Sequence, residues 1–112
     1  MKEIQGEGDN IPLNPTERKM YESEYKHGAD LFQRALNEHA KSDNIYQREE
    51  FKEVMEKAMQ VLNETASALK KKDLEQQNQQ IEQDYESYRN TGSLEAKDRL
   101  NRDLEKAKHS RP

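Results

Sequence analysis

The chain contains no cysteine, and this absence excludes several kinds of site. Without thiols there is no disulfide framework, no zinc site built from thiolates and no cysteine nucleophile. The chain also lacks an apolar run long enough for a cleaved signal peptide or a membrane-spanning helix. We therefore expect a cytoplasmic protein without a membrane span.

Large apolar residues are scarce. Leu, Ile, Val and Phe supply 17 of the 112 residues, a share below the roughly 20% under which disorder becomes a realistic alternative. Charged residues make up 38% of the chain, and the mean hydropathy is −1.42. The 19 basic and 23 acidic residues nearly cancel, however, and balanced charge is typical of exposed, salt-bridged helices. The composition predicts helices with too small a core, and hence a partner that completes it.

The first predicted helix begins at a complete set of start signals. Asn14 fits the N-cap, Pro15 the first helical position and Glu17 the position that reaches back to the cap. One side of this helix then carries mostly apolar or small residues at spacings of 4, 3, 4, 3 and 4, which predicts a helix over residues 15–41. Gly28 on this stripe indicates the close approach of another backbone. The stripe consists of Tyr21, Tyr25, Gly28, Phe32, Ala35 and His39.

A second helix is predicted to begin after residues 42–44. Asn44 and Gln47 have the spacing of another capping box, and the stripe that follows has the same 4, 3, 4, 3, 4 spacing. Such a repeat is typical of a seam that faces a partner helix. The short connection predicts an antiparallel hairpin with arms about 40 Å long. The second stripe consists of Phe51, Met55, Ala58, Leu62, Thr65 and Leu69.

After residues 70–73 the apolar stripe resumes out of phase. Because no glycine or proline interrupts the chain there, we predict a continuous helix over residues 44–90. Ser93 fits the N-cap of a third helix over residues 93–108. The alternative is a bend at residues 70–73 that folds the chain into a compact three- or four-helix bundle. The resumed stripe consists of Leu74, Asn78, Ile81, Tyr85 and Tyr88.

The predicted fold is therefore all-α, a long antiparallel helical hairpin plus a third helix, with coiled-coil-like seams. Residues 1–13 are predicted to be a flexible N-terminal arm, residues 14–109 one helical domain and residues 110–112 a tail. Asn78 lies on the resumed stripe within a polar tract. It belongs either to a solvated helix face or to a buried position that sets helix register.

Motifs for catalysis or metal binding are incomplete. Glu24 and His27 have the Glu-x-x-His spacing of di-iron bundles, but such a site needs a second pair, and the chain has none. We predict no catalytic, metal-binding or cofactor-binding residue. A metal-binding or enzymatic protein that uses Glu24 and His27 is one alternative. A nucleic-acid accessory factor that uses Lys70–Lys72 and the third helix is another, although Asp73 follows the lysines at once.

The function predicted from these patterns is non-catalytic protein–protein interaction. A small helical adaptor, assembly factor or secretion-type chaperone would present an apolar stripe to another protein or to a second copy of itself. Nucleic acid is not an expected partner. The predicted partner-binding residues are the large side chains of the stripes, namely Tyr21, Tyr25, Phe32, Phe51, Met55, Leu62, Leu69, Ile81, Tyr85 and Tyr88.

Overall fold

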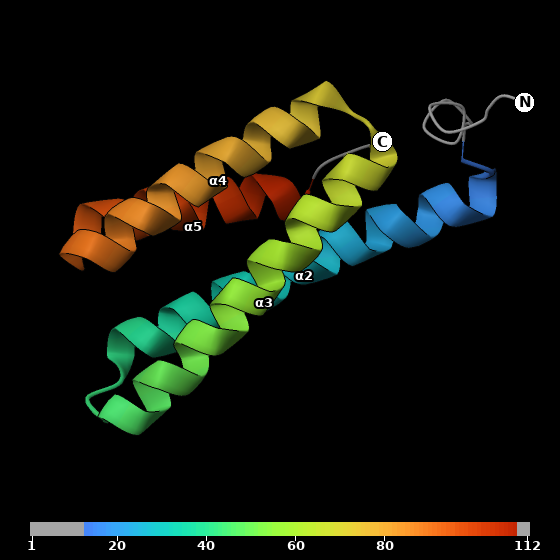
Figure 1. Cartoon of the computed structure of the whole chain (residues 1–112). Coiled ribbons are helices and arrows are strands. Elements are labelled where there is room, and N and C mark those ends of the chain that lie inside the picture. The colour runs from blue at the N-terminus through green and yellow to red at the C-terminus, as the bar shows by residue number, and fades with distance from the viewer. Residues whose placement is uncertain (1–12, 110–112) are drawn as a thin grey trace, which may run out of the picture.

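The structure is a computed structural model that describes residues 13–109. In this range the chain forms four α-helices and no strand, so the all-α prediction is confirmed, whereas the predicted count of three helices is wrong. The predicted arm and tail lie outside the described residues, except that Leu13 packs against the core. The helices are α2 (Pro15–Lys41), α3 (Ile45–Leu69), α4 (Lys72–Thr91) and α5 (Leu94–Lys108) (Figure 1).

Side-chain caps begin three of the helices. Asn14 and Glu17 form the reciprocal capping box at α2, and Ser93 accepts from the backbone N–H of Ala96 at α5. Asn44 caps α3, but the side chain of Gln47 bonds to Ser42 instead of returning to the cap. Local hydrogen bonds therefore place these three helix starts.

The predicted continuous helix over residues 44–90 is wrong, because α3 ends at Leu69 and α4 begins at Lys72. Lys70 takes a left-handed conformation with φ of 55°, which costs a non-glycine residue roughly 1–2 kcal/mol. The out-of-phase stripe explains why the chain accepts this cost. A straight helix would point Leu74 and its successors away from the first hairpin, whereas the reversal buries them on it.

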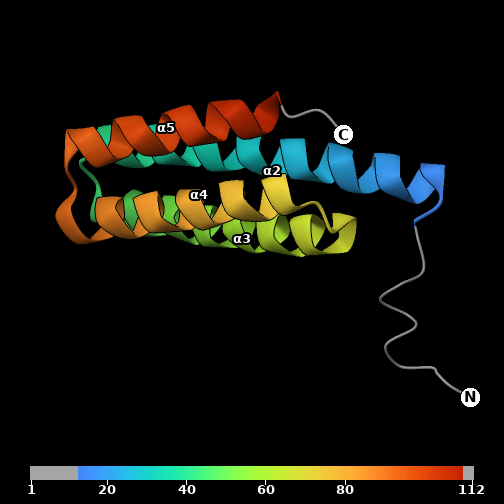
Figure 2. The ribbon, with the colours of Figure 1, turned by 90° about the horizontal axis from the view of Figure 1, so that it is seen from above.

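The four helices form an antiparallel bundle in which each helix packs against its two neighbours in the ring α2–α3–α4–α5. The bundle measures 56 × 24 × 22 Å, and its core runs along the inside of all four helices. α2 extends beyond the end of α5 on the side where the chain enters the bundle (Figure 2). The compact bundle that was the alternative interpretation is therefore the observed arrangement.

Contacts across the diagonal of the bundle join α2 to α4. The rings of Phe32 and Tyr85 meet edge to face, with centroids 5.3 Å apart. Further along, the Tyr25 hydroxyl bonds with Oδ1 of Asn78 at 3.0 Å, and Nδ2 of Asn78 donates to Asn63 of α3 at 3.3 Å. Asn78 is only 4% exposed. The buried interpretation of Asn78 therefore holds, and its bonds set α4 in register with α2 and α3.

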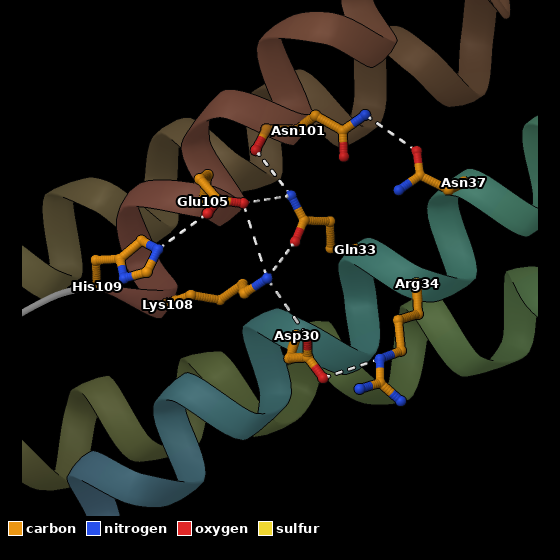
Figure 3. A network of polar contacts seen from close by, with 8 residues as sticks. All are labelled: Asp30, Gln33, Arg34, Asn37, Asn101, Glu105, Lys108 and His109. Carbon is orange, nitrogen blue, oxygen red and sulfur yellow. Dashed lines mark hydrogen bonds and ion pairs between the residues drawn. The ribbon is translucent and has the colours of Figure 1, made fainter.

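α5 has a narrow apolar side and also makes several polar contacts with α2 (Figure 3). Gln33 of α2 donates to Glu105 at 3.0 Å and accepts from Lys108 at 2.8 Å. Lys108 also lies 3.4 Å from the carboxylate of Asp30. Because hydrogen bonds are directional, these contacts orient α5 along α2, while the apolar side chains supply most of the driving force.

Candidate functional site

The candidate site is a cleft between α3 and α4, the pair of neighbouring helices with the fewest contacts. The two helices diverge from their connection toward the other end of the bundle (Figure 1). There a pocket of about 300 Å³ lies between the first half of α3 and the second half of α4. Its lining consists of His39, Ile45, Arg48, Glu49, Lys52, Met55, Tyr85, Tyr88, Arg89 and Gly92.

The floor of the cleft is buried and largely apolar. Met55, Tyr85 and Tyr88 are 1%, 4% and 6% exposed. The Tyr88 hydroxyl is hydrogen-bonded to Nδ1 of His39 at 2.8 Å, which ties α4 to the last turn of α2. Burial, reinforced by the nearby charge of Glu56, raises the pKa of Tyr85 to about 12. The phenols are therefore neutral near pH 7, and the floor presents aromatic surface with few free polar groups.

Three cations line the walls of the cleft. Arg48 donates from Nη1 to the carbonyl oxygens of His39 and Ser42, both at 3.1 Å. These bonds hold the guanidinium between the end of α2 and the start of α3. Arg89 enters from α4, and Lys52 from the first half of α3.

The pKa of His39 reports the electrostatics of the floor. Burial lowers the pKa of this imidazole, and the charges of Arg48 and Lys52 lower it further, against the opposing effect of Glu49. The neutral imidazole is therefore favoured near pH 7. The cleft thus combines an apolar floor with positively charged walls, in a chain whose net charge is −4.

Exposed apolar side chains lie at the end of the bundle where the cleft opens. Ile45, which lines it, is 69% exposed, and its neighbour Tyr46 is 81% exposed. Leu94 is also 69% exposed and begins α5 at the same end of the bundle. Covering one such side chain from water is worth about 1.5–3 kcal/mol, so this end of the molecule favours an apolar contact.

No protein-family model, characterised protein or solved structure matches this chain. The interpretation of the cleft therefore depends on its own geometry. None of the helices in residues 13–109 has the apolar stretch that crossing a membrane requires. Within the same range, no three His, Asp or Glu side chains lie close enough together to hold a metal ion.

Most of the predicted partner-binding residues face the interior of the bundle. Tyr21 and Phe51 are half-buried, and the other eight are at most 7% exposed. Tyr85, Tyr88 and Met55 come together on the floor of the cleft, but Tyr25 bonds to α4 elsewhere along the core. The stripes thus find their partner helices within the chain. The eight buried residues are Tyr25, Phe32, Met55, Leu62, Leu69, Ile81, Tyr85 and Tyr88.

The residues that line the walls and mouth of the cleft were missed by the sequence interpretation. Ile45 carried a usable signal, because it is a large apolar residue that lies off the stripe of its helix. Arg48 and Lys52 carried none, since charged residues on a helix of this composition are ordinary. The divergence of α3 from α4 opens the cleft that these two cations line together with Arg89.

The two alternative sites obtain little support from their surroundings. Glu24 and His27 are both exposed, in a shallow groove between α2 and α3. In the basic run, Lys71 is half-buried and lies 3.5 Å from Glu22, while on α5 Arg99 and Lys108 each lie beside acidic side chains. Much of this positive charge is therefore compensated by carboxylates, whereas nucleic acid requires a continuous basic surface.

A pair of carboxyl groups lies between α4 and α5. Asp84 is 5% exposed, lies 3.6 Å from Nε of Arg99 and accepts from Gln80. Oδ2 of Asp103 is buried beside it without a donor. Two carboxyl groups can bond to each other only when one holds a proton. Burial, and then the hydrogen bond and charge of Asp84, raise the pKa of Asp103 to about 7.

Stability should therefore depend on the proton of Asp103. The pKa of Asp103 is raised in the folded state. The protonated carboxyl group therefore contributes fully to the free energy of unfolding below about pH 4, and this contribution is lost as the pH rises through about 7. Asp103→Asn keeps a donor for Asp84 at every pH, so we expect it to exceed the wild type in stability at pH 8. Because the group is partly exposed, the gain should be on the order of 1 kcal/mol, about 5 °C in Tm.

Thermal unfolding of both proteins at pH 5 and pH 8, followed by circular dichroism, measures this gain. The difference between the two proteins is the informative quantity, because the lowered pKa of His39 acts on stability in the opposite sense. A gain of equal size at both pH values would contradict the assignment.

Proposed function

We propose that the protein is a non-catalytic binding module that takes up a segment of another protein in the cleft between α3 and α4. The main support is the composition of the cleft, with an aromatic floor and the exposed side chain of Ile45 in its lining. Next to Ile45 in the chain, Tyr46 is also exposed, and large exposed apolar side chains that lie close together are typical of protein contacts. An adaptor, an assembly factor and a secretion-type chaperone all belong to this class.

The size of the cleft favours a side chain or a helix edge over a catalytic centre. A volume of about 300 Å³ is at the lower end of the range for ligand pockets and suits one or two anchoring side chains. Its groups also lack a reactive arrangement. The hydrogen-bond partner of His39 is the phenol of Tyr88, and no serine or threonine lines the cleft to act as a nucleophile.

Site-specific cross-linking tests this proposal. A photoreactive phenylalanine analogue replaces Ile45, which lines the cleft, and in a matched control it replaces Arg34, whose side chain is 77% exposed on α2. We expect a discrete adduct with another protein from position 45 and none from position 34. With the purified partner, Ile45→Ser should weaken binding about tenfold, because the apolar anchor is lost.

Two results would contradict the proposal. Equal yields from both positions would show that the cleft is not a preferred contact. Adducts formed only between copies of this chain would replace the external partner by a second copy.

A further inference from the structure

We infer that the segment bound in this cleft is acidic, with carboxylates on either side of one apolar or aromatic side chain. This inference rests on the proposed function and adds the chemistry of the partner.

Both helices turn a continuous face toward the cleft. The lining residues of α3 lie at positions 45, 48, 49, 52 and 55, and those of α4 at positions 85, 88 and 89, with Gly92 just beyond the end of α4. Spacings of three and four keep each set on one side of its helix. An inserted side chain would therefore reach Met55 and Tyr88 on the floor, while its chain neighbours would meet Lys52 and Arg89 higher on the walls.

The charge of the lining is opposite in sign to that of the chain. Three of its ten residues are cations and only Glu49 is an anion, although the whole chain carries a net charge of −4. Positive walls above an apolar floor attract carboxylates and disfavour a basic segment. The site is also too narrow for a nucleic-acid backbone, which needs basic residues along an extended surface.

Of the three cations in the lining, Lys52 alone has neither a hydrogen bond nor an ion pair within residues 13–109. Arg48 is held by two backbone carbonyl groups, and Arg89 lies 3.6 Å from Glu56 and 3.8 Å from Glu86. Lys52 is half-buried, and among the described residues it has neither an ion pair nor a hydrogen bond. A carboxylate of the partner would supply the missing charge at this position.

His39 provides a readout that is independent of affinity. The cations of the cleft lower the pKa of its imidazole, and a bound carboxylate would offset part of their effect. An acidic segment should therefore raise the pKa of His39, whereas a neutral segment would bury the imidazole further and lower it. The direction of this change distinguishes the two kinds of occupant.

Selection from a display library of random 12-residue peptides tests the inference on the full chain. We expect selection against the wild type to enrich peptides with two or more Asp or Glu residues beside one large apolar residue. Lys52→Glu should weaken the binding of the enriched peptides tenfold or more. Lys57→Glu makes the same charge change at an exposed position of α3 outside the cleft, and it should alter affinity less than twofold.

Further measurements identify the site and the source of the charge. Titration of the His39 imidazole by NMR should show a raised pKa with the selected peptide. Free glutamate at the same concentration should have no such effect, because it lacks the apolar anchor. Circular dichroism verifies that both variants fold, and Lys52→Gln replaces Lys52→Glu if reversal of the charge prevents folding.

The outcomes separate the inference from the proposed function. If the enriched peptides were neutral or basic and changed the NMR signals of His39 and Tyr88, the inference of an acidic partner would be overturned, and the proposed binding function would stand. An absence of enrichment, or binding that leaves both residues unchanged, would overturn both. If free glutamate alone raised the pKa of His39, the cleft would be a simple anion site, and the inference that it binds a peptide segment would be overturned.

Discussion

Replacing Phe32 with alanine is expected to lower the free energy of unfolding by about 3–5 kcal/mol. Phe32 is fully buried and meets the ring of Tyr85 edge to face, across the diagonal between α2 and α4. A domain of this size has only roughly 5–15 kcal/mol of stability in total. The loss should therefore remove a large part of it, because few other large side chains are fully buried.

Urea denaturation followed by circular dichroism measures the loss. Leu31→Ala is the matched control, since Leu31 is the preceding residue of the same helix and is 40% exposed. We expect the control to change stability by less than about 1 kcal/mol. Similar losses in the two variants would mean that Phe32 does not form part of the core.

A leucine at Gly28 is expected to destabilise the bundle by about 1–3 kcal/mol. Helix propensity alone predicts the opposite, because glycine costs nearly 1 kcal/mol within a helix. A Cβ at this position would lie 3.2 Å from Cγ1 of Val61 and 3.5 Å from Cδ2 of Leu62. The additional atoms of leucine have no space there, so α2 and α3 must separate or repack.

A double-mutant cycle tests this cause. Val61→Ala removes the nearest atom, so Gly28→Leu should cost less in that background than in the wild type. Chemical denaturation of the four proteins gives the coupling energy. A gain in stability from Gly28→Leu alone would show that α3 does not approach α2 closely at this point.

The sequence correctly placed Gly28 where α2 closely approaches another helix, but it did not identify the atoms that Gly28 meets. The sequence indicated close approach of a second backbone, whereas the nearest atoms belong to side chains of α3. Periodicity identifies the side of a helix that meets a neighbour. It does not identify the atoms of the neighbour, because these depend on the register between two helices.

The interpretation of the stripes shows a similar limit. A scarcity of large apolar residues led us to expect that a partner completes the core. In the structure the four narrow stripes face one another, and alanines and tyrosines supply much of the buried surface. The surface that we propose for a partner is the cleft between α3 and α4, whose cationic walls lie outside the stripes.

The sequence by itself determined where three of the four described helices begin and which side of each helix is buried. Helix caps and the spacing of apolar residues act within a few positions along the chain, so they can be recognised in the sequence alone. The caps are Asn14, Asn44 and Ser93. Tertiary structure alone decided the reversal at Lys70, the pairing of Asp84 with Asp103 and the cationic cleft. Each of these depends on the packing of α4 against the first hairpin, because it brings together groups that are distant in sequence.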